Sequence, residues 1–364
     1  MNNDIFIGTR KGLFRHRQGE LELVGFLGVP VTNVLHDRRD GRLHVAVDHG
    51  HFGCKTHYSD DGGATFVESS PPTYPPRPVD AADVDPVRGD DVVWSTSLIW
   101  TLAAGHDDDT DALWCGTIPG GLFRSEDRGE SWELVRSLWD DPSRPQWFGG
   151  GYDSPGIHSV SVDPSDADTL VVGISCGGVW ITHDRGVTWQ VGSGLKAGFM
   201  PPDQAENPYI QDPHRVVRCR DEPAAMWTQH HSGMFRSTDG GANWTEIVDV
   251  DPSTFGFAVA AHPSDPGTAW FVPSQSDEVR VPVDGRMVVT RTTDGGQTFE
   301  TLCDGLPQQH GYHLVYRHGL DVDETGERLV LGSTSGSLWV SDDAGDHFTN
   351  VTNDLPPIAA VHFA

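Results

Sequence analysis

At 364 residues, of which 37% are hydrophobic, the chain is long enough to bury an apolar core without disulfide or metal staples. Its net charge of −28 argues against nucleic acid and anionic membranes as partners, because an acidic surface repels both. No apolar run approaches the ~20 residues that cross a bilayer as a helix, and the 42 Gly and 25 Pro favour many short strands joined by turns over helices.

The basic residues and the cysteines bear on where the protein works. Only three of the 25 basic residues are Lys, a composition that resembles proteins from high-salt cytoplasms, where salt screens the repulsion between carboxylates. An ordinary acidic soluble protein is the alternative. The five cysteines are scattered and lack a C-x-x-C pair, which favours reduced thiols. Residues 1–14 lack a basic segment followed by an apolar core, so we expect no signal peptide and a cytoplasmic location.

Six related polar boxes punctuate the chain. They share the spacing Ser/Thr-x-Asp-x-Gly-x-x-Trp/Phe, and the clearest of them reads STDGGANW. Successive box aspartates are 66, 57, 55, 55 and 49 residues apart, and self-similarity at such a period indicates a repeat architecture. The boxes lie at Ser59–Phe66, Ser125–Trp132, Thr182–Trp189, Ser237–Trp244, Thr292–Phe299 and Ser341–Phe348.

The unit around the third box shows what one repeat contains. Apolar residues in short runs predict strands at Ile157–Asp163 and Thr169–Ser175, and again at Val179–Thr182 and Thr188–Gly192. Turns rich in Gly, Pro and Asp separate them, and the box itself joins the third strand to the fourth. Four antiparallel strands per repeat predict the blade of a β-propeller.

The same frame fits the rest of the chain and predicts seven blades in one all-β domain covering residues 1–364. The N-terminus supplies three strands and the C-terminus a lone strand at Ile358–Phe363, which we expect to complete the first blade. This pairing closes the ring and removes exposed sheet edges. The other blades are expected from about Thr32 to Ser69, Leu98 to Ser137, Ile157 to Gly192, His214 to Asp249, Phe255 to Asp304 and Tyr312 to Asn353.

Four long segments fall outside this frame. Ser70–Trp94, Leu138–Gly156 and Lys196–Pro213 each link the fourth strand of a blade to the first strand of the next, and Gln275–Gly285 joins strands two and three of blade six. In a propeller both kinds of connection lie on the same face. Long loops gathered on one face of a rigid scaffold predict a functional site there.

The boxes themselves are interpreted as structural, because their Asp and Ser side chains can order turn amides and their Gly relaxes φ. They resemble those of the Asp-box (BNR-repeat) propellers, and the resemblance covers essentially the whole chain. The chain is similar to the intracellular, single-domain, seven-bladed branch that opens with a GTRKGLF-like stretch, here Gly8–Phe14, and is labelled sialidase-like or glycosyl hydrolase. The Arg-Ile-Pro motif expected of a sialidase is missing, so no sialidase residue is carried over.

Histidines gather at one mouth of the central channel when the first strand of each blade is placed innermost. Convergent imidazoles on a rigid ring suit a divalent Zn, Mn or Fe ion. The arrangement is similar to that of oligogalacturonate lyase-like propellers, which hold a metal with His and Gln at this mouth. The alternative is that each histidine is a hydrogen-bonded structural residue. The candidate metal ligands are His158, His214, His231, His49, His51 and Gln229.

Four further residues are candidates for catalysis at the same mouth. Tyr312 is a candidate general acid or base. Arg317 and Arg280 are candidates to hold an anionic substrate group by bidentate hydrogen bonds. Glu278 is a candidate carboxylate for glycosidase chemistry, which needs two facing acids. The sequence contains no P-loop or Rossmann fingerprint, so we expect no nucleotide cofactor.

These observations favour a hydrolase or lyase acting on a small polar, carbohydrate-like or anionic substrate, at a His-rich mouth that offers ligands for a metal. One alternative is a non-catalytic scaffold or sensor that binds a peptide or protein on the same face. Another is a carboxylate-dependent glycosidase. The substrate, the metal and the oligomeric state stay open at this point.

Overall fold

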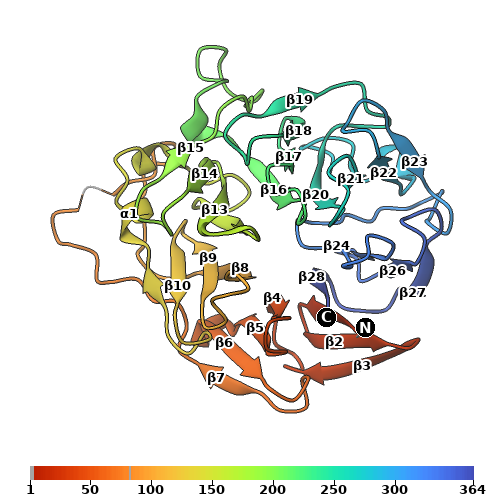
Figure 1. Cartoon of the computed structure of the whole chain (residues 1–364), viewed down its shortest axis with the longest axis horizontal. Helices are drawn as coiled ribbons and strands as arrows, with labels where there is room; N and C mark the ends of the chain where they lie inside the picture. The colour runs from red at the N-terminus through yellow and green to blue at the C-terminus, as the bar shows by residue number, and fades with distance from the viewer. Residues whose placement is uncertain (1–3, 82) are drawn as a thin grey trace.

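Seven four-stranded antiparallel sheets are arranged as blades around one axis in the computed structural model, which describes residues 4–81 and 83–364 (Figure 1). In six blades the strands follow chain order from the axis outward, and in blade one the C-terminal strand is innermost. The sequence-based prediction of an all-β, seven-bladed propeller is therefore confirmed.

The strands have the following bounds, blade by blade. Blade one has β28 (Ile358–Phe363), β1 (Ile5–Thr9), β2 (Gly12–Arg17) and β3 (Glu20–Gly25); blade two has β4 (Val31–His36), β5 (Leu43–Asp48), β6 (Cys54–Ser59) and β7 (Val67–Ser69). Blade three has β8 (Leu98–Ala104), β9 (Leu113–Ile118), β10 (Leu122–Ser125) and β11 (Glu133–Leu134); blade four has β12 (Gly156–Asp163), β13 (Asp166–Ser175), β14 (Gly178–Thr182) and β15 (Gln190–Val191). Blade five has β16 (Pro213–Arg218), β17 (Met226–His230), β18 (Gly233–Ser237) and β19 (Thr245–Ile247); blade six has β20 (Gly256–Ala261), β21 (Ala269–Pro273), β22 (Val289–Thr292) and β23 (Glu300–Leu302). Blade seven has β24 (Leu320–Val322), β25 (Leu329–Gly332), β26 (Leu338–Ser341) and β27 (Thr349–Thr352); the short helices are η1 (Gly50–Phe52), α1 (Arg136–Trp139), η2 (Arg144–Gln146), η3 (Pro208–Ile210) and η4 (Val283–Gly285).

Strand β28 closes the ring by pairing with β1. The two strands run antiparallel, from Ile5 opposite Phe363 to Thr9 opposite Ile358. The two ends of the chain therefore lie in the same blade (Figure 1). Ile358 also packs in one apolar cluster with Val330 of blade seven, so the C-terminal strand joins the first blade to the last. The expected completion of blade one by the C-terminal strand is confirmed.

Blade seven begins later than the sequence predicts. Its first strand starts at Leu320, whereas the prediction placed the start of the blade at Tyr312. The backbone turns sharply before the strand, because the N–H of Gly319 donates to the carbonyl of Tyr316 at 2.6 Å. A Cβ at position 319 would lie 2.6 Å from the carbonyl oxygen of Gly332, so this close approach requires glycine.

Each Asp box orders the turn between the third and fourth strands of its blade. In the box that starts at Ser237, the Ser hydroxyl donates to Asp239 Oδ1 at 2.8 Å and accepts from the N–H of Gly241 at 3.0 Å. The N–H of Asn243 then donates to Asp239 Oδ1 at 2.9 Å. The same three bonds recur in the other five boxes. The box residues thus satisfy turn amides that no strand pairs.

Large aromatic side chains fill the space between neighbouring blades. Trp180, Trp227, Trp270 and Trp339 are each at most 2% exposed. Trp270 of blade six shares one apolar cluster with Leu331 and Trp339 of blade seven. Each buried aromatic side chain removes about 150–250 Å² from water. Since these side chains lie between blades, the interfaces between blades form the core of the molecule.

The long connections brace one another. Arg144 Nη2 in the connection between blades three and four lies 2.8 Å from Asp83 Oδ2 in the connection between blades two and three. The N–H of Gly149 donates to Asp85 Oδ2 at 3.2 Å, and Arg88 pairs with Asp153. These contacts tie the loop that lines the candidate site to a second loop rather than leaving it free in solvent.

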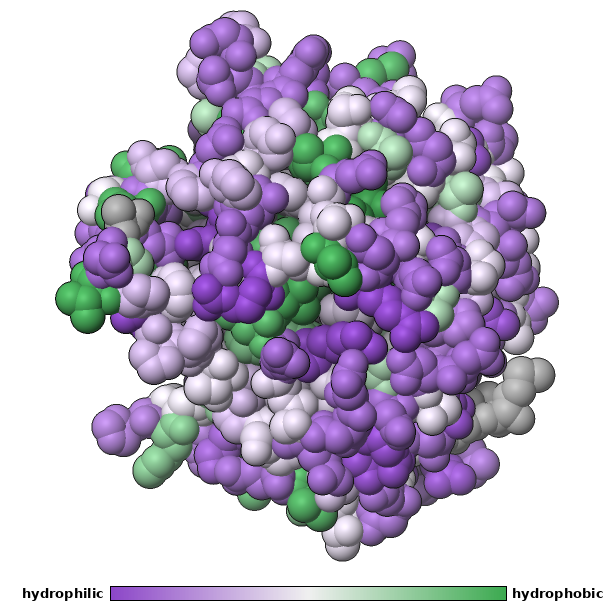
Figure 2. All heavy atoms as spheres, turned by 60° about the vertical axis from the view of Figure 1, so that its left-hand side comes forward, coloured by the Kyte–Doolittle hydropathy of each residue, from purple (hydrophilic) through white to green (hydrophobic). Residues whose placement is uncertain are grey.

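The surface is mostly hydrophilic. Hydrophilic residues cover most of the face seen in Figure 2, and apolar residues collect in a hollow of that face. Within residues 4–81 and 83–364, no helix has the length and apolar character that a membrane crossing requires.

Replacing one box aspartate tests whether the boxes stabilise the fold. We expect Asp239→Ala to lower the free energy of unfolding by about 1–3 kcal/mol, because the turn loses the acceptor for Ser237 and Asn243. Urea denaturation measures this change. The exposed Asp107, which receives no hydrogen bond among the described residues, provides the control, and Asp107→Ala should stay within about 0.5 kcal/mol of the unmodified protein. Equal effects of the two substitutions would contradict a structural role for the box.

The boxes also predict an acid-sensitive component of stability. Hydrogen bonds from Thr65, Thr188 and Thr298 respectively lower the pKa of Asp61, Asp184 and Asp294 to about 2. Since these values lie below the unfolded pKa of about 3.9, this contribution is present above pH ~4 and is lost as the pH falls through ~2. Urea midpoints should drop between these pH values in the unmodified protein. The drop should be smaller in the triple Thr→Val variant at the three donor positions, and an unchanged drop would contradict the assignment.

Candidate functional site

A cavity of about 220 Å³ lies where blades four to seven meet the long connections. Its walls come from the loop before blade four, the loop before blade five, the insertion in blade six and the turn before β24. Segments that are far apart in the chain therefore supply one site on the loop-bearing face. The cavity is lined by Phe148, Gly150, Gly151, Cys176, Phe199, Asp212, His214, His231, Phe257, Asp277, Arg280 and Arg317.

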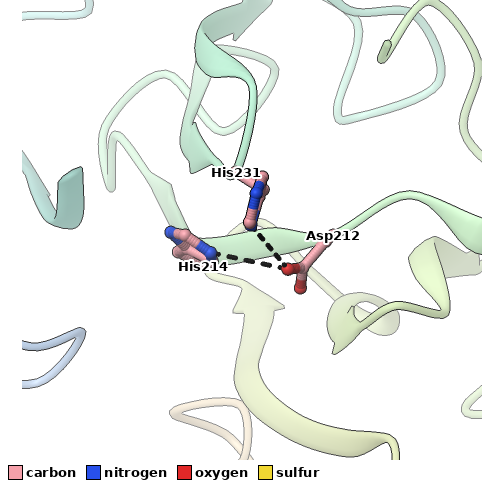
Figure 3. Close-up of side chains that lie close together, drawn as sticks. All are labelled: Asp212, His214 and His231. Atoms are coloured by element: carbon pink, nitrogen blue, oxygen red, sulfur yellow. Dashed lines mark ion pairs between the residues drawn. The ribbon is translucent and has the colours of Figure 1, made fainter. Parts of the chain in front are cut away.

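Asp212, His214 and His231 form the polar centre of this cavity (Figure 3). Asp212 Oδ2 lies 3.5 Å from His214 Nε2 and 3.3 Å from His231 Nδ1. One ligand atom from each residue lies within 4.8 Å of the others, so the three could hold a single metal ion. Asp212 and His214 sit at the start of β16, and His231 in the turn after β17 is held by an N–H bond of 2.9 Å to the carbonyl of Asp212.

The Asp212 carboxylate is oriented by the neighbouring blade. Its Oδ1 accepts from Ser175 Oγ at 2.9 Å and from the N–H of Cys176 at 3.1 Å. These bonds leave Oδ2 to face the two histidines. Burial by itself would raise the pKa of Asp212, but its contacts with the side chains of His214 and His231 hold it well below its usual value. The carboxylate is therefore ionised at neutral pH.

The surroundings of His214 define its tautomer. Its Nδ1 lies 2.7 Å from the carbonyl oxygen of Gly256, which can only accept, so Nδ1 carries the proton. The neutral ring then presents the Nε2 lone pair to Asp212 Oδ2, an electron-rich atom 3.5 Å away. A proton or a metal cation between the two atoms removes this repulsion. Metal-bound histidines commonly donate their other ring N–H to a backbone carbonyl in this way.

Arg317 is a buried cation without an anionic partner. The residue is 8% exposed, and its guanidinium lies 4.7 Å from the ring centre of Trp100 and 5.6 Å from that of Phe257. Among the described residues it makes no ion pair or hydrogen bond, and its Nε is buried without an acceptor. Burial lowers the pKa of Arg317, while Asp212 opposes that shift. An arginine remains charged after such a shift, so this wall of the cavity attracts an anionic group.

The insertion in blade six forms another wall. Its backbone is pinned by a bond of 2.8 Å from the N–H of Gln275 to the carbonyl of Val281. Asp277 Oδ2 lies 3.7 Å from His231 Nε2, which places a second carboxylate on the far side of that ring from Asp212. Arg280 pairs with Asp277 and lies 5.4 Å from the ring centre of Phe257.

The structure brings four of the candidate residues from the sequence into this cavity: His214, His231, Arg280 and Arg317. His158 does not line it. That residue is fully buried, with Nδ1 2.9 Å from Ser159 Oγ, and burial holds its pKa well below the usual value.

Gln229 is equally enclosed, because its Nε2 donates to the carbonyls of His230, Gly233 and Thr254. The remaining candidates, His49, His51, Glu278 and Tyr312, are exposed and do not line the cavity.

Sequence reasoning missed Asp212, the residue that joins the two histidines. Its signal was present in the stretch QDPH, where an acid and a histidine two residues apart stand at the start of a strand. The aromatic rings around Arg317 were missed as well. Trp100 lies in β8 of blade three and Phe257 in β20 of blade six, and no local pattern relates either ring to position 317.

Known sequences match one of the repeats and part of the chain. The BNR-Asp box repeat matches residues 122–135, which include the second box. A xyloglucanase from Paenibacillus sp is 24% identical over 280 residues, covering 68% of this chain and 25% of that protein. The chain thus spans about a quarter of the length of this relative.

Solved structures share the fold at low sequence identity. The crystal structure of a GH74 xyloglucanase from Xanthomonas campestris superposes with a TM-score of 0.68 and 16% identity, covering 97% of this chain and 53% of that one. The structure of YCF48 bound to D1 peptide gives a TM-score of 0.53 and 14% identity, covering 88% and 80%. Together with the six boxes and the seven four-stranded sheets, these findings identify the chain as a seven-bladed β-propeller that carries BNR-Asp box repeats.

Proposed function

We propose that this propeller is an enzyme that cleaves a small carbohydrate-like substrate bearing an anionic group, with a divalent metal held by Asp212, His214 and His231. The observation that carries the proposal is the position of Arg317. It is a buried, unpaired cation in the same cavity as the Asp212 group. Arg317 can bind an anionic group, and the Asp212 group beside it can bind a cation. This arrangement suits a substrate whose charged group is held next to the bond that reacts.

The donor set supports a metal. Two imidazoles and one carboxylate suit Zn, Mn or Fe, and the tautomer of His214 leaves its Nε2 lone pair free toward Asp212. When bound, such an ion would polarise a substrate oxygen or a water molecule. Three protein ligands leave coordination positions open to the substrate.

Other side chains of the cavity supply binding and proton transfer. The guanidinium of Arg317 offers paired N–H donors for a carboxylate, and the Trp100 and Phe257 rings keep water away from that contact, which strengthens it. Asp277 is the remaining carboxylate on the wall and serves as the proton acceptor or donor. The likeness to a protein named xyloglucanase supports a carbohydrate-like substrate, although this chain spans only part of that relative.

A carboxylate-dependent glycosidase is the second candidate. Asp212 and Asp277 approach opposite nitrogens of His231, at 3.3 and 3.7 Å, so two acids flank one side of the cavity. Glycosidases use such pairs without a metal. In that case activity should survive chelation but fall on Asp277→Asn. Under the first proposal both treatments should reduce activity.

Metal binding tests the first proposal directly. We expect about one divalent ion per chain after reconstitution with Zn²⁺ or Mn²⁺, measured by isothermal titration and by elemental analysis after desalting. His231→Ala should weaken binding at least about tenfold, because one of three ligands is lost. His49→Ala is the matched control, since His49 is exposed and outside the cavity. Unchanged metal affinity in both His231→Ala and Asp212→Asn would overturn the ligand assignment.

Substrate charge tests the role of Arg317. The unmodified protein should bind a uronic acid more tightly than the corresponding neutral sugar. Arg317→Met should remove most of that difference, a loss of about tenfold or more in affinity for the acid. Arg286→Met, at an exposed arginine outside the cavity, should leave the difference in place. Equal binding of the acid and the neutral sugar by the unmodified protein would contradict an anionic substrate and favour a propeller that binds another class of partner.

A further inference from the structure

A second cavity, of about 210 Å³, shares no lining residue with the first. It is formed by the later residues of the innermost strands of blades five, six and seven, whereas Asp212 and His214 stand at the beginning of β16. The second cavity therefore opens toward the ends of these strands, away from the candidate active site. None of its residues takes part in the proposed reaction.

Four arginines line this cavity beside the three carboxylates of Asp321, Asp323 and Glu324, although the chain has 53 acidic and only 25 basic Lys and Arg residues. The arginines among its lining residues are Arg38, Arg215, Arg218 and Arg220. Arg38 and Arg220 share one carboxylate, that of Glu324, at 2.6 and 3.2 Å. Arg220 also lies 3.6 Å from Asp221, so both of these arginines have a carboxylate partner.

Arg215 is the cation that lacks a carboxylate partner altogether. Among the described residues its guanidinium makes a single hydrogen bond, from Nη1 to the carbonyl oxygen of His158 at 3.2 Å. Burial lowers the pKa of Arg215 to about 10, and Asp321 opposes that shift without forming an ion pair. Arg215 is half-buried, and its guanidinium stays charged at neutral pH with most of its five N–H donors free of protein acceptors.

Asp321 compensates the charge of Arg215 only in part. Its Oδ2 accepts from the N–H of Phe363 at 2.9 Å and lies 3.5 Å from His362 Nδ1. Arg218 is already satisfied by Asp163 at 2.7 Å, a residue outside the lining. The free capacity of the cavity is therefore for an anion that reaches Arg215.

We propose that this second cavity binds a small oxyanion of the phosphate or sulfate class through Arg215, with Arg38 and Arg220 at its rim. The planar fork of a guanidinium matches two oxygens of such an anion. Arg38 follows β4 of blade two and Arg215 lies in β16 of blade five, so the bound anion links blades from different parts of the ring. Binding then stabilises the closed propeller by mass action. The proposal is independent of the chemistry assigned to the first cavity.

Inorganic phosphate is the probe for this site. The titration uses the Arg317→Met variant, so that the first cavity contributes no cation, and sodium chloride at matched ionic strength is the reference. Replacing the unpaired buried Arg317 by Met leaves no charge unsatisfied and should preserve the fold. Phosphate should bind this variant and raise its Tm above that in chloride. Adding Arg215→Met should weaken phosphate binding by about tenfold or more, whereas adding Arg136→Met, at an exposed arginine of α1, should not change it.

The second part of the experiment removes a negative charge from the cavity instead of a positive one. Asp321→Asn keeps an oxygen for the Phe363 N–H but removes the competing negative charge, so phosphate affinity should rise. This arm decides the question if the Arg215→Met protein fails to fold. The proposal is overturned if phosphate does not bind the Arg317→Met variant. It is also overturned if neither Arg215→Met nor Asp321→Asn changes the phosphate affinity. Loss of phosphate binding on Arg317→Met alone would assign the anion to the first cavity and also overturn it.

Discussion

The pairing of β28 with β1 is the contact on which the rest of this structure depends. Seven twisted sheets can enclose a common axis only if the last blade meets the first, and here the C-terminal strand supplies the innermost strand of blade one. Closure sets the innermost strands of all blades side by side with their beginnings on one face. The strand starts and the long connections then converge there, which is why residues from blades four to seven can line one small cavity.

Two positively charged side chains lack an anionic partner in the part of the chain that the structure describes, although the protein as a whole is strongly acidic. In a chain with a net charge of −28, the buried Arg317 and the half-buried Arg215 have no carboxylate partner among the described residues. Unpaired buried charges are costly, and they persist where a ligand compensates them or where they serve a function. Arg317 stands beside the Asp212 group in the first cavity, and Arg215 reaches into the second. Both proposals made for this protein follow from these two cations.

The candidate site could be predicted in part. His214, His231, Arg280 and Arg317 follow from the blade frame, because that frame places strand starts and the loops between second and third strands on one face. His49 and His51 satisfy the same rule but belong to blade two, and the cavity is bordered by blades four to seven. His158 fails for another reason. It stands at a strand start, yet it is enclosed beside Trp100 and Ser159.

The sequence by itself determined the number of blades, the closing strand and the role of the boxes. These features are local, since each box bonds residues no more than four positions apart and each strand is marked by its own apolar pattern. Only the tertiary structure decided which polar groups meet. Asp212 faces His231 because a turn after β17 returns the chain to the start of β16, and Arg317 lies in the turn that the bond from Gly319 to Tyr316 closes before β24. Contacts of this kind depend on side-chain packing between blades, which no short stretch of sequence encodes.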